Sequence, residues 1–278
     1  MTSPPADSAG VPWQGRSFGE HPSSADDGSA PPQLMAALAR FRAGGCSTLD
    51  VIEAIRVSRL LIPLVAELVV AVVPDAVLPD TELPETEHLG AGHRGRDGDK
   101  SANLGVVTVA APDGRRVLPV FSSVDAMTVW NPDARPVPSD AVRVGLAAAS
   151  EGTELVVLDP GSVSEFVIRR PAVWALAQSL PWVPSFLDDE VLAAILAAAA
   201  PEASVAAVLL DAGDPNARLA GPELDVAVAI HPGLARAELE AVLRRLSDRI
   251  AADEVIAARV DSLAIRVIDA TSLDRADS

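Results

Sequence analysis

The stretch that decides the fold runs from Val117 to Ile168 and reads VLPVFSSVDAMTVWNPDARPVPSDAVRVGLAAASEGTELVVLDPGSVSEFVI. Short apolar runs alternate in it with segments of helical periodicity, and proline, glycine or a capping residue marks each change. The predicted strands are 117–121, 155–158 and 164–168. Helices are predicted to begin after Ser122 and Ser139, which have the character of N-terminal caps. This part of the chain should therefore form a compact α/β unit.

Upstream of this stretch the alternation continues. Residues 34–55 predict a helical hairpin, and residues 59–66 predict the first strand of a sheet. Two further strands, Asn103–Ala111 and Arg115–Phe121, are predicted to pair across a turn at 112–114. Pro119 cannot donate a backbone hydrogen bond, so the second of these strands is expected at a sheet edge or frayed there.

The whole chain is predicted to be α/β (α+β) with two domains. The predicted divisions are a tail at 1–32, a mixed-sheet domain with flanking helices at 33–178, a linker at 179–187, a smaller ββαβ domain at 188–270 and a tail at 271–278. A long polar loop is predicted at 74–101, inside the first domain. The first tail is polar, but Trp13 and Phe18 lie in it. These two side chains either dock on the first domain or belong to a free tail.

Several of these motifs together are similar to those of a known family. LPVFSSVDAMTVW, the RPVP step and the LDPGS turn, with RLLIPLVAE upstream and RRPAVWALAQSLPW downstream, resemble the SseB family, named for enhanced serine sensitivity. The resemblance is to an actinobacterial type, and residues 201–268 resemble the SseB C-terminal domain. It implies an N-terminal and a C-terminal SseB domain, a role linked to serine sensitivity or stress, and no catalytic residues.

Composition excludes several classes of partner. The 278 residues carry a formal net charge of −17, and the sequence pI is about 4.5, so the protein repels phosphate backbones and anionic lipids. We therefore expect no nucleic acid and no membrane as partner. The N-terminus lacks the basic and apolar regions of a secretory signal, and the single cysteine forms no internal disulfide; we expect a cytoplasmic protein.

The sequence offers little for catalysis or metal binding. Cys46 is predicted in a helix connector, where it is either a weakly activated nucleophile or a small residue that fills a turn. His88 and His93 lie near several acids in the polar loop, but their spacing matches no metal motif. We predict no metal, no cofactor and no catalytic residue. The protein is expected not to be an enzyme.

Binding is the function that remains. The predicted strand-to-helix turns at Ser122-Ser123 and Arg169-Arg170 present helix N-termini, hydroxyl groups and guanidinium groups. We therefore predict that these four residues bind an unidentified protein or small molecule, and that replacing both arginines weakens binding without harming the fold. The alternative is a small-molecule enzyme whose site lies between the domains and has no linear motif.

Overall fold

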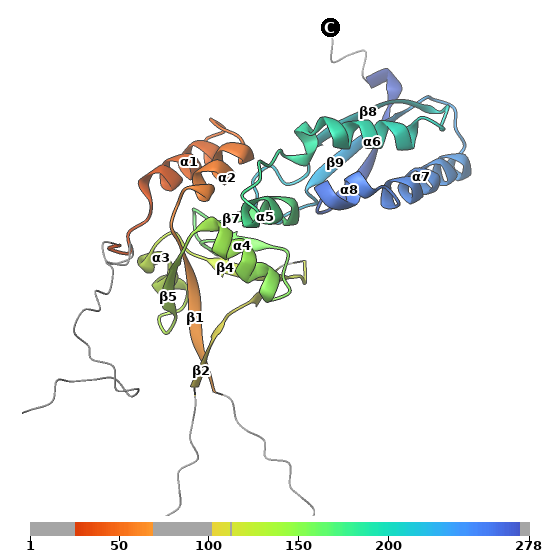
Figure 1. Ribbon diagram of the computed structural model, residues 1–278. Coiled ribbons are helices and arrows are strands. Elements are labelled where there is room, and N and C mark those ends of the chain that lie inside the picture. The colour runs from red at the N-terminus through yellow and green to blue at the C-terminus, as the bar shows by residue number, and fades with distance from the viewer. Residues whose placement is uncertain (1–25, 69–101, 112, 273–278) are drawn as a thin grey trace, which may run out of the picture.

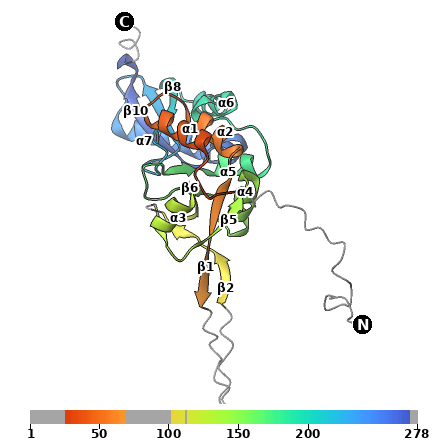
Figure 2. The same cartoon turned by 90° about the vertical axis from the view of Figure 1, so that its left-hand side faces the viewer.

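The computed structural model describes residues 26–68, 102–111 and 113–272, which form two units lying side by side (Figures 1 and 2). The first unit contains α1 (Pro32–Arg42), α2 (Thr48–Arg56), β1 (Leu60–Leu68), β2 (Ala102–Val106), β3 (Val109–Ala110), β4 (Arg116–Val120), α3 (Val124–Trp130), β5 (Arg135–Ser139), α4 (Ala141–Ser150), β6 (Val156–Leu158), β7 (Phe166–Ile168) and α5 (Arg170–Ala177). The second contains η2 (Ser185–Leu187), α6 (Asp189–Ala199), β8 (Val205–Ala212), β9 (Leu224–Ile230), α7 (Arg236–Ala251), α8 (Glu254–Arg259), β10 (Leu263–Asp269) and η3 (Ala270–Ser272). The architecture is α+β, as the sequence predicts.

Local capping chemistry sets most helix starts. Ser47 and Asp50 form a capping box at the start of α2. The cap of α3 is Ser123, one residue later than predicted, because its hydroxyl accepts the backbone N–H of Ala126 whereas Ser122 donates to Asp159. The cap of α4 is Asp140, one residue later than predicted, because its carboxylate accepts the N–H of Arg143 at 2.8 Å. Ser139 instead ends β5.

β1 organises the first sheet of the first unit. Its first half pairs antiparallel with β5 and its second half pairs antiparallel with β2, which gives the order β2-β1-β5. The predicted strand Asn103–Ala111 is therefore wrong as a single element. Its first part, β2, pairs with β1, whereas its last part, β3, makes the expected short hairpin with β4. This segment thus contributes β2 to the first sheet and β3 to the second.

The second sheet has the order β3-β4-β6-β7, so β4 is an inner strand rather than the predicted edge. Pro119 is tolerated for a local reason. The paired residues of β3 reach only Arg116 and Val117, and the next contact on that side is the bridge between Leu61 and Phe121. The proline nitrogen faces the gap between these two contacts, so β4 loses no ladder hydrogen bond there.

A three-stranded sheet, β10-β9-β8, forms the second unit, with α6, α7 and α8 on one face (Figure 1). Val226 and Val228 of β9 pack in the same core as Ile195 of α6 and Leu246 of α7. α8 is a helix that the sequence analysis missed. Asp253 caps it by accepting the N–H groups of Val255 and Ile256.

The segment between β8 and β9 joins the two units. Ala217 belongs to the core of the first unit and Leu219 packs on the opposite face of the β4-β6-β7 sheet. The N–H of Val167 in β7 donates to the carbonyl of Ala217 at 2.8 Å. The two units are therefore linked by buried apolar and backbone contacts, besides the chain itself.

The carboxylate of Glu202, between α6 and β8, binds two arginines of α7. It accepts from Arg245 at 2.6 Å and from Arg249 at 2.8 Å, and its side chain is 6% exposed. These hydrogen bonds, first that of Arg245 and then that of Arg249, lower the pKa of Glu202 to about 2 from 4.5. Because the folded pKa lies below the unfolded one, the stabilisation is complete above pH 4.5 and is lost as the pH falls toward 2.

We therefore expect Glu202→Gln to melt at a lower temperature than the parent protein at neutral pH. The difference should shrink as the pH falls, because the parent protein then loses the same charge. Thermal melts between pH 7 and pH 2 measure this. Glu240→Gln is the control, since Glu240 makes only an exposed pair with Arg236 on the same helix. An equal effect of both substitutions would contradict the assigned role of Glu202.

The predicted linker, residues 179–187, remains the expected site of proteolysis. Leu180, Val183 and Leu187 in it are about half exposed. Brief digestion should cut there, but the two fragments should stay together, since Ala217 and Leu219 are buried against the first unit. Gel electrophoresis and size-exclusion chromatography test the two points. A first cut within Val117–Ile168 would contradict the architecture; the predicted loop 74–101 lies outside the described residues.

Candidate functional site

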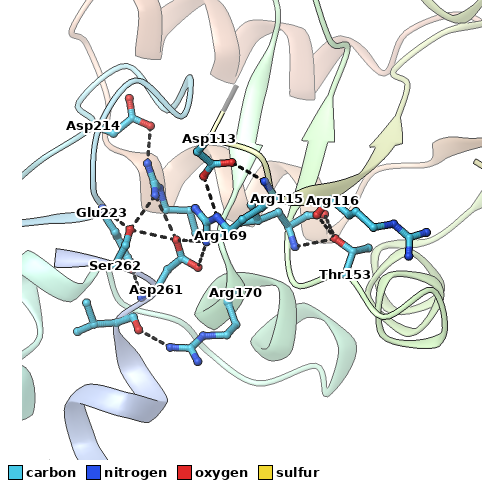
Figure 3. Close-up of polar contacts among 12 residues, drawn as sticks. Asp113, Arg115, Arg116, Thr153, Arg169, Arg170, Asp214, Glu223, Asp261 and Ser262 are labelled. Atoms are coloured by element: carbon cyan, nitrogen blue, oxygen red, sulfur yellow. Dashed lines mark hydrogen bonds and ion pairs between the residues drawn. The ribbon is translucent and has the colours of Figure 1, made fainter. Parts of the chain in front are cut away.

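Arg169 lies at the centre of a buried cluster between the two units (Figure 3). It is the N-cap of α5, directly after β7, and its side chain is only 8% exposed. One of its terminal nitrogens is 2.8 Å from a carboxylate oxygen of Asp214, and the other is 3.2 Å from Asp261. It also donates to the carbonyl of Gly221 and the hydroxyl of Ser262. A residue of the first unit thus holds two segments of the second, the β8–β9 connection and the residues just before β10.

Asp261 is shared by two arginines. Arg115, in the β3–β4 turn, donates to both its carboxylate oxygens at 2.9 and 3.0 Å, and pairs with Asp113 as well. The backbone N–H of Asp261 donates to Glu223 at 2.6 Å. Burial raises the pKa of the Glu223 carboxyl, and this hydrogen bond offsets the rise only in part.

Arg170 also reaches the second unit. Its guanidinium donates to the backbone carbonyls of Ala257 and Val260, and stacks over the ring of Trp174 at 5.1 Å. Both arginines of the predicted binding turn therefore contact the second unit of their own chain. Whether they also bind a ligand stays a prediction, but a ligand would compete with these contacts. The sequence analysis also predicts that replacing both arginines leaves the fold intact. The burial of Arg169 argues against that prediction.

Ser122 and Ser123 lie elsewhere. Ser122 is 2% exposed, and both its N–H and its hydroxyl donate to Asp159, at 2.8 and 2.7 Å. Ser123 caps α3. Because β7 runs antiparallel to β6, Arg169 lies beside the beginning of β6, whereas Ser122 lies beside its end. The structure therefore does not bring the two predicted turns together.

A pocket of about 50 Å³ lies beside the arginine cluster. Its walls come from both units: α2, β7, the start of α5, the connection at 182–186 and the segment that joins β8 to β9. Apolar groups form most of the wall, including the aromatic side chains of Phe166, Trp182 and Phe186. Arg169, Asp214 and Glu223 supply its charged groups. An apolar pocket with a few convergent polar groups is the usual form of a small-molecule site.

Two buried polar atoms of the pocket residues have no hydrogen-bond partner within the described part of the chain. They are Nε1 of Trp182 and Oγ1 of Thr48. Most buried polar atoms in folded proteins are hydrogen-bonded, so each exception requires an explanation. The indole N–H can only donate, whereas the threonine hydroxyl can donate and accept. Both atoms are enclosed, so a molecule in the pocket bonds to them only once small side-chain shifts expose them.

The other places in the described residues that could bind or react have fewer features of a functional site. Cys46 is half-buried in the α1–α2 connection, where its Sγ lies 3.5 Å from the carbonyl of Ala37. No group of three or more potential metal ligands occurs in the described residues, and the two histidines of the predicted loop lie outside them. No helix in the described ranges is long and apolar enough to span a bilayer. A wider groove between the segment at 26–33 and the start of α4 is lined mainly by polar residues, with several prolines among them.

The comparison with known families decides the affiliation of the chain. The family model of the SseB protein N-terminal domain matches residues 34–175. The chain belongs to the SseB family. No curated protein and no solved structure matches it.

The matched residues run from α1 into α5, so the SseB domain contains Arg169 and one wall of the pocket. Asp214, Asp261 and Glu223 lie beyond the match, in the second unit. The sequence analysis missed these three acids and Trp182, because no local motif connects them with Arg169.

Proposed function

We propose that this SseB-family protein is a non-catalytic binding protein, and that a small molecule occupies the pocket between the SseB domain and the second unit. The observation that carries the proposal is that Trp182 and Thr48, two residues lining one apolar pocket, each hold a buried polar atom, Nε1 and Oγ1, that has no partner among the described residues. A ligand that accepts from the indole and bonds the hydroxyl removes the cost of leaving both groups unsatisfied.

The pocket limits the size of the ligand. One water needs about 10–15 Å³ of such space, so the pocket holds roughly three to five non-hydrogen atoms without side-chain movement. This is the size of a small metabolite. Nucleotides and most cofactors are too large for it.

The wider assignment is part of the proposal. The second unit is proposed to be the SseB C-terminal domain, and the protein is proposed to act in the cytoplasm as an actinobacterial-type member. The resemblance links the family to serine sensitivity and stress. Binding of a small metabolite is one way to influence such a phenotype, and the pocket provides a place for it.

The alternative is a small-molecule enzyme with its site in the same pocket. Glu223 favours this alternative, because a carboxyl group with a raised pKa in a pocket can act as a general acid or base. The two hypotheses differ in the fate of the ligand. A binding protein returns it unchanged, whereas an enzyme converts it, and NMR spectra of the ligand after prolonged incubation distinguish the two.

The test begins with a screen of small cytoplasmic metabolites by thermal shift. Trp182→Phe keeps an aromatic ring in the pocket but removes the N–H donor. We expect every hit to lose at least ten-fold in affinity with this variant, which corresponds to about 1.4 kcal/mol. Trp174→Phe is the matched control, since Trp174 is exposed on α5 outside the pocket. Hits that bind Trp182→Phe with the same affinity as the parent protein would overturn the proposal.

A further inference from the structure

The charged groups of the pocket differ in how they are compensated. Asp214 is paired with Arg169, and Arg169 itself donates to two carboxylates, a carbonyl and a hydroxyl. Glu223 has no arginine within ion-pair distance in the described part of the chain and accepts the backbone N–H of Asp261. Of the two acids that line the pocket in the described residues, Asp214 forms an ion pair with Arg169, whereas Glu223 interacts with Arg169 only at longer range.

This arrangement disfavours an anionic ligand. An anion would meet two carboxylates, and Arg169, which supplies the one guanidinium that the described residues bring to the wall, is already occupied by protein acceptors. A cation would instead lie beside Glu223. Burial raises the pKa of Glu223, and the nearby charge of Asp261 adds to this rise, so a bound cation would offset part of the cost of ionising Glu223.

The aromatic residues point to the same chemistry. The chain has four tryptophans, five phenylalanines and no tyrosine, and three of these lie in the wall of this one pocket. Aromatic rings combined with a carboxylate are a common environment for ammonium groups, since the faces of the rings carry partial negative charge. The indole N–H of Trp182 requires, in addition, an acceptor on the ligand.

We propose that the ligand is a short amine with an acceptor oxygen, whose ammonium group binds Glu223 and whose oxygen accepts from Trp182. This inference rests on the proposed function, because it names the ligand class of the same pocket. The smallest molecules of this class have four or five non-hydrogen atoms and match the space in the pocket.

Three probes of nearly equal size separate the role of charge from that of shape. Ethanolamine carries the ammonium group, ethylene glycol replaces it with a hydroxyl, and glycolate replaces it with a carboxylate. Binding is followed by the ¹H–¹⁵N resonance of the Trp182 indole, assigned with Trp182→Phe. We expect ethanolamine to shift this resonance with an affinity at least ten-fold above that of ethylene glycol, and glycolate to leave it unchanged.

Glu223→Gln should abolish the preference for ethanolamine. Asp225→Asn is the matched control. Asp225 lies in β9, two residues after Glu223, and the substitution also removes one carboxylate, but Asp225 pairs with Arg266 and lies outside the pocket. Melting curves show that both variants are folded. The inference is overturned if ethanolamine causes no shift, or if it binds no more tightly than ethylene glycol or glycolate. It is also overturned if Glu223→Gln binds ethanolamine as tightly as the parent protein does. A neutral hit that requires Trp182 would overturn the inference alone and leave the proposed function standing.

Discussion

Arg169→Ala is expected to lower the free energy of unfolding by about 3–5 kcal/mol, because it leaves the buried carboxylates of Asp214 and Asp261 without their shared guanidinium. Asp214 and Asp261 are 3% and 1% exposed at the side chain, so water cannot replace the lost donors without local opening. Chemical denaturation, followed by circular dichroism, measures the loss.

Arg170→Ala is the control for this prediction. Arg170 donates to carbonyls rather than carboxylates, and its removal leaves no buried charge without a partner, so we expect a loss of about 1–2 kcal/mol. A loss below 1 kcal/mol for Arg169→Ala, or equal losses for both variants, would show that the cluster does not hold the units together.

Asp159→Ala is the second change with a large expected effect. The carboxylate of Asp159 accepts the N–H and hydroxyl of Ser122 and the hydroxyl of Ser164, and the residue is 1% exposed. Its φ of 46° also favours aspartate or asparagine over alanine. Loss of a charged acceptor for two buried donors and one half-buried donor, together with backbone strain, should cost about 3–5 kcal/mol.

Two further variants separate these contributions in the same denaturation experiment. Asp159→Asn keeps the tolerated backbone conformation and one carbonyl acceptor, so it should lose roughly half as much. Ser164→Ala removes a single hydrogen bond and should cost about 1 kcal/mol. If Asp159→Asn were as damaging as Asp159→Ala, the negative charge would be the main contribution, and the strain argument would fail.

The sequence predicts those elements that local chemistry determines. The helical hairpin of α1 and α2, the strand β6 and the turn after Asp159, where Gly161 has a φ of 77°, all appear as expected. Strand pairing is decided by residues far apart in the chain. For that reason the break in Asn103–Ala111, where one segment passes from β1 to β4, had no local signal.

In the candidate site, too, the sequence predicts what local chemistry determines and misses what depends on residues far apart in the chain. Arg169 was found from its position between a strand and a helix, but its partners, Asp214 and Asp261, lie 45 and 92 residues further along the chain. One signal could have helped: Asp159 and Asp214 each precede a proline in a turn, and such aspartates often accept hydrogen bonds from the following backbone. Nothing local marks Trp182 as a pocket residue, since its surroundings come from both units.

The central claim is that a small molecule binds between the SseB domain and the second unit. The most direct measurement is a crystal structure of the protein with the tightest hit from the metabolite screen. We predict electron density for the molecule within hydrogen-bond distance of Trp182 Nε1 and Thr48 Oγ1. Density for it elsewhere, for instance in the polar groove beside residues 26–33, with the pocket holding only water, would contradict the account.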